Sequence, residues 1–428
     1  MEKSFYTQWI IDPARKFMSN SSMSGVVLLS AAFISVILSN SPLADWFNNI
    51  WKIKIGFSIG DFSVNKDLHH WINDGLMAVF FFVVGLELKR EIIAGELSTP
   101  RKALLPIVAA IGGMIFPAAI YLSFNHPMTL TGDGWGIPMA TDIAFALGIL
   151  YLLGDKVPLS LKIFLTALAI VDDLGAVLVI AFFYTSDIHV TSLITGVIFM
   201  AILVIGNLIG IRSTLFYGLI GIGGLWTAFL MSGVHATIAA VLAAFTIPAR
   251  VQISEQPFYM KMVHLMDRFR DTEPNESPTI TKEQHQLLSK IEQLTNEAST
   301  PLQRLEHSMH PLVAFVIMPV FALSNSGIEI NSELLSGFDN PVTLGVSIGL
   351  FAGKFIGVTG MVALMYFLKI SPLPDGCNWW HMIGVGFLAA IGFTMALFIT
   401  GLAFENPGYV EQAKLGIIFT SLVAGTIG

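Results

Sequence analysis

The chain has 428 residues, of which 54% are hydrophobic and only 12% are charged, and its formal net charge is -7. A water-soluble domain carries about a quarter charged residues, so this composition excludes an ordinary soluble protein. The single cysteine, Cys377, cannot form an internal disulfide and has no companion ligands for a zinc or iron–sulfur site. The sequence has no basic patch that would favour a nucleic acid partner. We therefore expect no cofactor, no redox chemistry and no nucleic acid binding.

Apolar stretches of about 20 residues, the length that crosses about 30 Å of hydrocarbon, recur along the chain. Because these stretches are continuous rather than alternating, they exclude a closed β-barrel. The sequence predicts an all-α polytopic membrane protein in which residues 1–428 form one integral membrane domain. The twelve predicted spans lie near 22–40, 69–88, 103–124, 136–153, 158–184, 190–210, 213–231, 234–249, 310–328, 341–368, 379–402 and 410–428.

The distribution of basic residues predicts the orientation. With the N-terminus in the cytoplasm, only Lys52, Lys54, Lys66 and Lys414 fall outside and Lys354 lies within a span, whereas every other Lys and Arg falls inside. This asymmetry favours two cytoplasmic termini. The first apolar stretch has the length of a full span and no small-residue cleavage signal, so we expect it to be retained.

Two polar regions interrupt the predicted spans. In 52–66, apolar residues alternate with lysines or small residues on either side of Gly60 and Asp61, which is typical of a β-hairpin. An irregular surface loop is the alternative. In 251–305, the composition is charged and polar, and Pro274 and Pro278 interrupt the first half. We predict a cytoplasmic loop there with one short helix near 281–296, and its role is open between regulation and none.

Ionisable residues lie inside the apolar stretches, where their cost marks an ion or proton pathway. Asp172 and Asp173 are adjacent within one span. Since consecutive helical residues point about 100° apart, one carboxylate can face a cavity while the other faces a neighbouring helix. Carboxylates bind hard cations and also titrate, so one site can hold either protons or a cation. A pair that only joins two helices is the alternative, although a single Asn would do this at lower cost.

Two spans have the composition of interrupted helices. Thr141 and Asp142 follow a glycine-rich stretch with Pro138, and Thr394 lies between Gly392 and Gly401. Freed backbone groups are tolerated at membrane depth only where protein or water replaces the lost hydrogen bonds. Asp142 would then compensate the positive end of a half-helix. Close packing of unbroken helices remains the alternative.

Lys354 is a lone lysine in the middle of a predicted span. An unpaired ammonium there would be very costly, so we expect Lys354 to pair with one of the aspartates or to offset the carbonyl end of a half-helix. Snorkelling of the side chain to the interface is the alternative. Asp74 lies near the outer end of the second span, and His235 is interpreted as a packing residue rather than a ligand.

Two clusters of mixed charge lie at the inner ends of spans, in 87–91 and in 304–310. The usual excess of basic residues at the cytoplasmic end of a span explains Lys89 and Arg90 but not Glu87 and Glu91. The second cluster contains His307 and a further histidine, which titrate near physiological pH. The pattern is compatible with a pH-responsive entrance to an ion pathway and with an ordinary solvated helix end.

Five motifs carry a resemblance to a known family. They are INDGLMAVFFFVVGLELKRE at 72–91, ATDIAFALGIL at 140–150, LKIFLTALAIVDDLGA at 161–176, RLEHSMHP at 304–311 and IGFTMALFI at 391–399. With them the chain resembles the NhaA-type sodium/proton antiporters over nearly its whole length. Such transporters are built from inverted repeats with interrupted helices at the midplane.

The resemblance implies specific roles. Helices 3 to 5 and 10 to 12 would form the two inverted repeats, with helices 4 and 11 unwound and crossing. The ion- and proton-binding residues would be Asp172, Asp173, Thr141 and Asp142. Lys354 and Asp142 would compensate charge, and Lys354 would either pair with Asp172 or balance the helix ends. The residues of the pH response would be Glu87, Arg90, Glu91, Glu306 and His307. The hairpin at 52–66 would join two protomers.

Two departures from the family pattern are visible. Phe355 follows the buried lysine where the family has a proline, which leaves the helix geometry near Lys354 open. The 251–305 loop is longer than in compact members, which leaves the control by pH open.

The function expected from residues and resemblance is electrogenic exchange of cytoplasmic Na⁺ or Li⁺ for external H⁺. This exchange would serve sodium and pH homeostasis with activation at alkaline pH. The protein would be a multi-pass transporter rather than an enzyme, in a bacterial inner membrane, with lipid and a second protomer as partners. The alternatives are a sodium-coupled symporter of an organic solute, an intramembrane aspartyl protease, whose GxGD signature the sequence lacks, and a channel.

Overall fold

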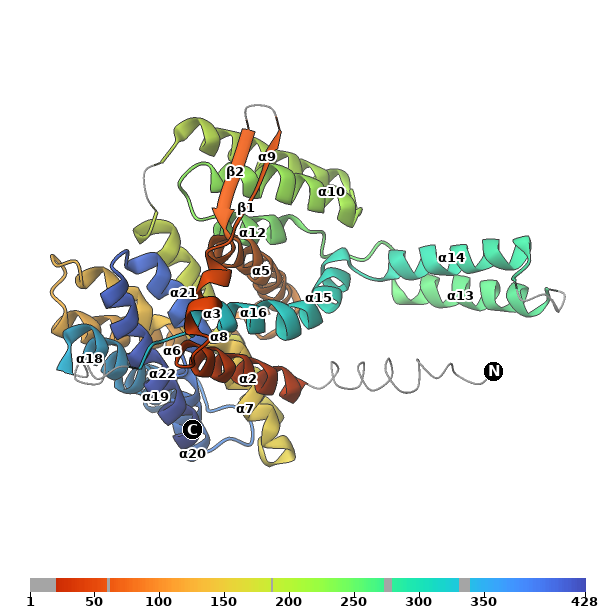
Figure 1. The fold of residues 1–428 in the computed structure, drawn as a ribbon. Coiled ribbons are helices and arrows are strands. Elements are labelled where there is room, and N and C mark those ends of the chain that lie inside the picture. Colours follow the sequence, from red (N-terminus) through yellow and green to blue (C-terminus); the bar gives the residue numbers. More distant parts are fainter. Residues whose placement is uncertain (1–20, 60–61, 186–187, 273–278, 331–338) are drawn as a thin grey trace.

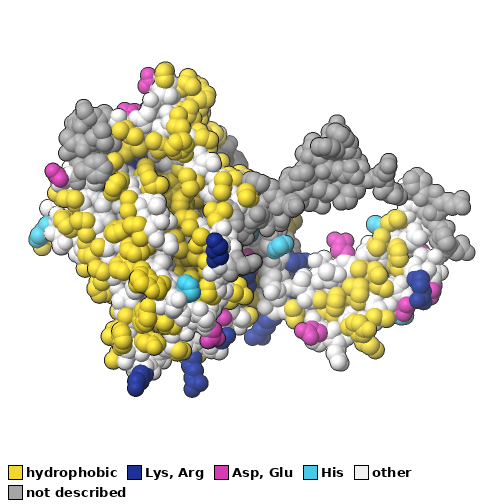
Figure 2. Space-filling view, turned by 90° about the horizontal axis from the view of Figure 1, so that it is seen from below, with side chains coloured by type: hydrophobic (Ala, Val, Ile, Leu, Met, Phe, Trp, Pro, Cys, Tyr) yellow, Lys and Arg dark blue, Asp and Glu magenta, His cyan; other side chains and the backbone are white. Residues whose placement is uncertain are grey.

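The computed structural model describes residues 21–59, 62–185, 188–272, 279–330 and 339–428. Long helices make up the body, a β-hairpin projects from it, and two helices extend away from it as an arm (Figure 1). In this orientation the surface of the body is largely hydrophobic, with few charged side chains (Figure 2). Such a surface suits contact with lipid rather than with water.

The first part of the chain leads through the hairpin into the second predicted span. Its elements are α2 (Ser21–Ser39), α3 (Ala44–Trp51), β1 (Lys54–Ile59), β2 (Phe62–Asp67), α4 (Leu68–His70), the π-helical η2 (Trp71–Leu76) and α5 (Met77–Ala94). The two strands pair antiparallel from Lys54 with Asp67 to Ile59 with Phe62, which confirms the predicted hairpin. Its predicted turn, Gly60 and Asp61, lies outside the described residues.

The middle of the chain contains the first interrupted span. Its elements are η3 (Glu96–Ser98), α6 (Pro100–Phe124), η4 (Gly132–Met139), α7 (Ile143–Leu152), η5 (Gly154–Lys156), α8 (Leu159–Phe183), α9 (Val190–Ile209), α10 (Thr214–Gly218), η6 (Leu219–Trp226), α11 (Thr227–Leu230) and α12 (Ala236–Thr246).

The last part of the chain contains the arm and the second interrupted span. Its elements are α13 (Glu255–Arg270), α14 (Lys282–Ala298), α15 (Pro301–Leu312), η7 (Val313–Ile317), α16 (Met318–Asn325), α18 (Pro341–Ile348), η9 (Gly349–Gly353), α19 (Lys354–Phe367), α20 (Trp379–Ala389), α21 (Phe393–Ala403) and α22 (Pro407–Ile427). The predicted helix near 281–296 is α14. The prediction that it is the only helix of 251–305 is wrong, because α13 precedes it and packs beside it.

Helix starts follow local chemistry. Proline occupies the first turn of α6, α15, α18 and α22, where its missing N–H costs no hydrogen bond. Side chains of Asn340, Asn378 and Asn406 accept hydrogen bonds from the first amides of α18, α20 and α22. These caps satisfy amides that have no partner within the helix.

Eight helices of the described chain are long and apolar enough to cross a membrane, and the bent pair Met23–Ser39 and Ala44–Trp51 adds a ninth candidate. Of the twelve predicted spans, eight or nine thus correspond to helices that are long and apolar enough to cross a membrane. The other predicted spans are helical as well, but α5 carries the charge cluster 87–91, and Thr214–Leu230 and Ala236–Thr246 are shorter. The chain is a multi-pass, all-α membrane protein.

Two runs of three helices have opposite directions in the body. The first run is α6, η4 with α7, and α8, and the second is α18 with α19, α20 with α21, and α22. Asn125 at the end of α6 donates a hydrogen bond to Pro341 at the start of α18, at 2.7 Å. Halfway along, Gly112 of α6 lies against Gly357 of α19. The two runs therefore begin at opposite ends of the body, as the predicted inverted repeats require.

The body has two distinct ends along α5. One end of α5 follows β2 and η2 in the chain. Near its other end, Arg90 pairs with Glu306 of α15, the helix that follows the arm. We call the end nearest β1 and β2 the hairpin face and the end nearest α13 and α14 the arm face.

Candidate functional site

The two interrupted helices meet at their breaks. The first break is 140–142, between η4 and α7, and the second is 390–392, between α20 and α21. The amide of Asp142 donates to the carbonyl of Ile391 at 2.7 Å, and the hydroxyl of Thr141 donates to the carbonyl of Ala389 at 2.9 Å. The predicted crossing of helices 4 and 11 is confirmed, and each break supplies hydrogen bonds that the other has lost.

Asp142 caps two half-helices at once. One carboxylate oxygen accepts the amide of Phe145 in α7 at 3.0 Å. The other accepts the amide of Thr394 in α21 at 3.0 Å together with the Thr394 hydroxyl. Because a helix N-terminus carries partial positive charge, a carboxylate between two such ends stabilises both. This geometry agrees with the charge compensation expected of Asp142.

Lys354 and Asp172 form a buried ion pair. The ammonium nitrogen of Lys354 lies 2.5 Å from one carboxylate oxygen of Asp172, and both side chains are inaccessible to solvent. Of the two pairings the sequence allowed, with an aspartate or with a half-helix end, the structure places the ammonium on the aspartate. Lys354 begins α19 directly after the π-helical η9, and Phe355 continues the helix while stacking on Phe387.

Asp173 is buried next to this pair and has no hydrogen-bond partner among the residues that the structure describes. Neither of its carboxylate oxygens has a hydrogen bond to any residue in the described ranges, and its side chain is 0% exposed. Thr141 lies close to the carboxyl group of the neighbouring Asp172. A buried polar group without a partner costs free energy, so a proton, a cation or water has to satisfy Asp173.

A cavity of about 300 Å³ leads from the arm face toward this site. Its walls include Glu87 and Glu306 near the arm face, Ala144 in the first turn of α7, and Thr166 of α8. Ala144 lies two residues after Asp142, and Thr166 lies two helical turns before Asp173. The cavity therefore extends from the arm face in the direction of the carboxylates, although Asp142, Asp172 and Asp173 do not line it.

The charged residues at the mouth of the cavity form a network. Arg90 lies 2.9 Å from Glu306 of α15 and 3.0 Å from Glu91. The second oxygen of Glu91 accepts the amide of Glu96 at 2.9 Å. These contacts connect the arm-face end of α5 with α15 and with the turn before α6.

Two of the predicted pH-responsive residues stand apart from these ion pairs. Glu87 lines the cavity and forms no ion pair with any residue in the described ranges. His307 is exposed on α15, beside Glu306 in the sequence. Outside this cluster, the imidazole of His235 contacts the carbonyl of Tyr184 at 2.7 Å, in line with a packing role.

Sequence reasoning missed one residue that holds the break in place. The hydroxyl of Ser421 in α22 accepts the amide of Phe393, the first residue of α21, at 3.2 Å. Ser421 is 3% exposed. A serine in an apolar helix is common in membrane proteins, and only the tertiary packing of α22 against α21 shows which amide it serves.

The arrangement suits exchange of small cations for protons. Two carboxylates, one of them without a hydrogen-bond partner in the described ranges, lie beside one ammonium at the meeting point of two interrupted helices. Carboxylate oxygens bind Na⁺ as hard ligands and bind protons at the same lone pairs. No cluster of His, Cys, Asp and Glu suited to a resident metal ion occurs in the part of the chain that the structure describes.

Comparisons with known proteins point to one family. The family model described as Na⁺/H⁺ antiporter 1 matches residues 15–428. The Na(+)/H(+) antiporter NhaA of Oleidesulfovibrio alaskensis is 48% identical over 417 residues, which are 97% of this chain and 92% of that protein. NhaA 1 of Saccharophagus degradans is also 48% identical, over 98% of this chain and 90% of its own. NhaA 2 of Syntrophotalea carbinolica is 45% identical, over 99% and 97%. The chain belongs to the Na⁺/H⁺ antiporter 1 family of membrane transporters.

Proposed function

We propose that this protein exchanges Na⁺ or Li⁺ for H⁺ at Asp172 and Asp173, with Thr141 and Asp142 beside them. The observation that carries the proposal is the buried carboxylate of Asp173, which has no partner among the described residues and adjoins a carboxylate held by Lys354. Family membership and the similar proteins named as Na(+)/H(+) antiporters support the same reaction. They give no support to a sodium-coupled symporter.

In the proposed cycle, protons and cation compete for the two carboxylates. When the site faces the cytoplasm, loss of protons admits the cation. When it faces outward, protonation releases the cation. Because a ligand shifts a conformational equilibrium only by its difference in affinity for the two states, occupancy of Asp172 and Asp173 has to change the balance between them. Two carboxylates accept two protons but share one monovalent cation, so the exchange is electrogenic.

The proposed orientation places the arm face in the cytoplasm of a bacterial inner membrane, with both termini on that side. Its support is the excess of Lys and Arg in the segments near the arm face. The arm then belongs to the cytoplasmic region 251–305. The cavity admits cytoplasmic cations, and external protons reach the site from the hairpin face.

The pH response is proposed for the cluster at the mouth of the cavity, which contains Glu87, Arg90, Glu91, Glu306 and His307. The Arg90–Glu306 pair joins α5 to α15 at this mouth, so a change in its charges alters the contact between two spans. Activation at alkaline pH follows if deprotonation there opens the route. An exchange rate that does not vary with pH would contradict this role.

Proteoliposomes with an imposed Na⁺ gradient and an internal pH dye test the assignment. We expect Asp172→Asn and Asp173→Asn each to abolish sodium-driven proton movement, because the amide cannot exchange a proton for a cation. Asp375→Asn, at an exposed carboxylate in the loop before α20, serves as the matched control and should exchange normally. Thermal unfolding in detergent checks that each variant folds. Normal exchange by either folded variant would reject the site.

A further inference from the structure

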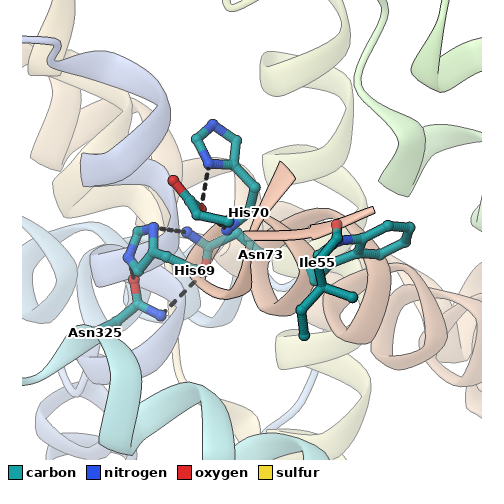
Figure 3. Close-up of polar contacts among 7 residues, drawn as sticks. Ile55, His69, His70, Asn73 and Asn325 are labelled. Atoms are coloured by element: carbon teal, nitrogen blue, oxygen red, sulfur yellow. Dashed lines mark hydrogen bonds and ion pairs between the residues drawn. The ribbon is translucent and has the colours of Figure 1, made fainter. Parts of the chain in front are cut away.

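Three side chains on the hairpin face close a ring of hydrogen bonds (Figure 3). Nε2 of His69 in α4 lies 3.1 Å from Oδ1 of Asn325, the last residue of α16. Nδ2 of Asn325 donates to Oδ1 of Asn73 in η2 at 3.0 Å. Nδ2 of Asn73 lies 3.3 Å from Nδ1 of His69. The ring joins the entrance of the second span to the end of α16.

The surrounding structure fixes the direction of every bond in this ring. Nδ2 of Asn325 also donates to the carbonyl of Phe321 at 3.1 Å, so Oδ1 of Asn325 has to face His69. Oδ1 of Asn73 faces the Asn325 donor, so Nδ2 of Asn73 faces Nδ1 of His69. His69 therefore donates through Nε2 and accepts at Nδ1, which is possible only for a neutral imidazole.

A protonated His69 cannot close the ring in any amide orientation. An imidazolium donates from both nitrogens, so its Nδ1 would face the Asn73 donor. Flipping Asn73 alone would place its Nδ2 against Nδ2 of Asn325. Flipping Asn325 as well would place a donor against Nε2 of His69 and turn an acceptor toward the Phe321 carbonyl. Each arrangement leaves two donors or two acceptors facing each other.

The groups around His69 are charged. Asp67 and His70 lie on the same turn, and Lys414 faces His69 from α22. On η2, Asp74 faces His235, His70 and Lys66. Burial favours the neutral form of Asp67, but the hydrogen bonds from the amide and ring of His70 hold the pKa of Asp67 below its usual value. Asp67 thus carries a negative charge on the turn that precedes His69.

The ring has a counterpart at the opposite ends of the same helices. At the arm face, the Arg90–Glu306 pair joins α5 to α15, which continues through η7 into α16. At the hairpin face, the ring joins η2, which leads into α5, to the end of α16. The entrance is also held by the indole of Trp71, which donates to Ile55 of the hairpin at 2.9 Å. Opening the ring would free α16 from the second span at this end.

We propose that His69, Asn73 and Asn325 form a proton-operated latch, closed while His69 is neutral and opened when His69 takes up a proton. The latch does not depend on the exchange reaction. That it responds to the external pH rests on the proposed orientation of the chain. It gives the protein a pH response on the hairpin face, separate from the cluster proposed at the arm face.

Amide hydrogen exchange of the purified protein, read by mass spectrometry at about pH 5 and about pH 8, tests the latch across the titration range of histidine. The peptides of interest cover 68–77 and 318–326. The non-titrating variant His69→Gln, which keeps one donor and one acceptor, is compared with the unmodified protein at each pH, so that the intrinsic pH dependence of exchange cancels. We expect the protection of the unmodified protein, divided by that of His69→Gln, to fall by about tenfold on acidification, as the loss of partly buried hydrogen bonds implies.

For a second variant we expect acidification to change the protection in the opposite direction. In Asn73→Asp, a carboxylate accepts both from Nδ1–H of a protonated His69 and from Asn325, so acidification should close the ring rather than open it. His70→Gln, at the exposed neighbouring histidine, is the matched control and should respond like the unmodified protein. An unchanged protection ratio for His69→Gln, or a response of Asn73→Asp in the same direction as the unmodified protein, would overturn the latch. Loss of exchange activity with this pattern intact would overturn the proposed function alone.

Discussion

At the scale of single residues, Lys354 and Asp172 depend on each other because both charges are out of water. Removing one partner of a buried pair leaves an uncompensated charge, which costs about 3–5 kcal/mol. We expect Lys354→Met to lower the free energy of unfolding by about this amount in detergent. The double variant Lys354→Met with Asp172→Asn should recover part of the loss, because it leaves neither charge buried.

The control for this pair is Lys261→Met, at an exposed position on α13. Thermal or denaturant unfolding of the four proteins gives the comparison. If Lys354→Met were no less stable than Lys261→Met, the buried ion pair would not contribute to the fold as described.

The sequence identified the buried ionisable residues of the candidate site, because charge within an apolar stretch is visible without a structure. The local pattern did not identify which aspartate meets Lys354, and only the resemblance named Asp172 as a possible partner. Asp172 and Asp173 differ only by the rotation of α8, and that rotation depends on how α8 packs against its neighbours. Ser421 was missed for the same reason, since no local pattern relates a serine in α22 to the first amide of α21.

At the scale of elements, the contact of α6 with α19 depends on two glycines. A Cβ on Gly357 would collide with the backbone carbonyl of Gly112, whereas a Cβ on Gly360 would meet nothing within 4 Å. Small residues let membrane helices approach closely, and overpacking costs about 1–3 kcal/mol. We therefore expect Gly357→Ala to lower the unfolding temperature and the exchange rate.

Gly360→Ala is the control on the same helix, and we expect it to be neutral or to stabilise the protein by at most about 1 kcal/mol, since alanine favours helix more than glycine. Equal effects of the two substitutions on thermal unfolding would show that helix propensity, rather than the close approach of α6 and α19, determines the result.

Interrupted helices could be predicted because glycine and proline beside Asp142, and glycine beside Thr394, are local signals. The helix α13 could not be predicted with the same certainty. Its apolar residues Phe258, Met262, Leu265 and Phe269 are only partly buried and face the antiparallel α14. Their periodicity is diluted by further exposed apolar residues such as Tyr259 and Met260. Pro274 and Pro278 follow the last residue of this helix, Arg270, so they do not interrupt it.

At the scale of the whole molecule, the proposed homodimer depends on the β-hairpin. A lone two-stranded sheet is marginal in water, and Ile53, directly before β1, and Ile55, in β1, are 54% and 50% exposed. A second protomer that covers these side chains would stabilise the hairpin. We expect the double variant Ile53→Asn with Ile55→Asn to shift the protein from dimer to monomer, as measured by its mass in detergent.

Ile330→Asn is the matched control, because Ile330 is 52% exposed near the same face but outside the hairpin. It should remain dimeric. A monomeric unmodified protein, or a double variant with the same mass as the control, would contradict dimerisation through the hairpin.

The overall plan of the molecule could be predicted because apolar length and basic asymmetry are additive properties of the sequence. The contact between the two helix breaks could not be derived from apolar length or from the distribution of basic residues. It places Asp142 between α7 and α21 and brings Thr141 onto the carbonyl of Ala389, through contacts between residues about 250 positions apart. The resemblance to a family supplied what local patterns could not.

The central claim is that Asp172 and Asp173 hold either protons or a cation, and never both together. Proton release on adding Na⁺ to the purified protein, followed across pH in a weakly buffered solution, tests it most directly. The account predicts release that disappears in Asp173→Asn and at acidic pH, where protons outcompete Na⁺. Binding of Na⁺, detected by calorimetry, without release of protons at any pH would contradict it.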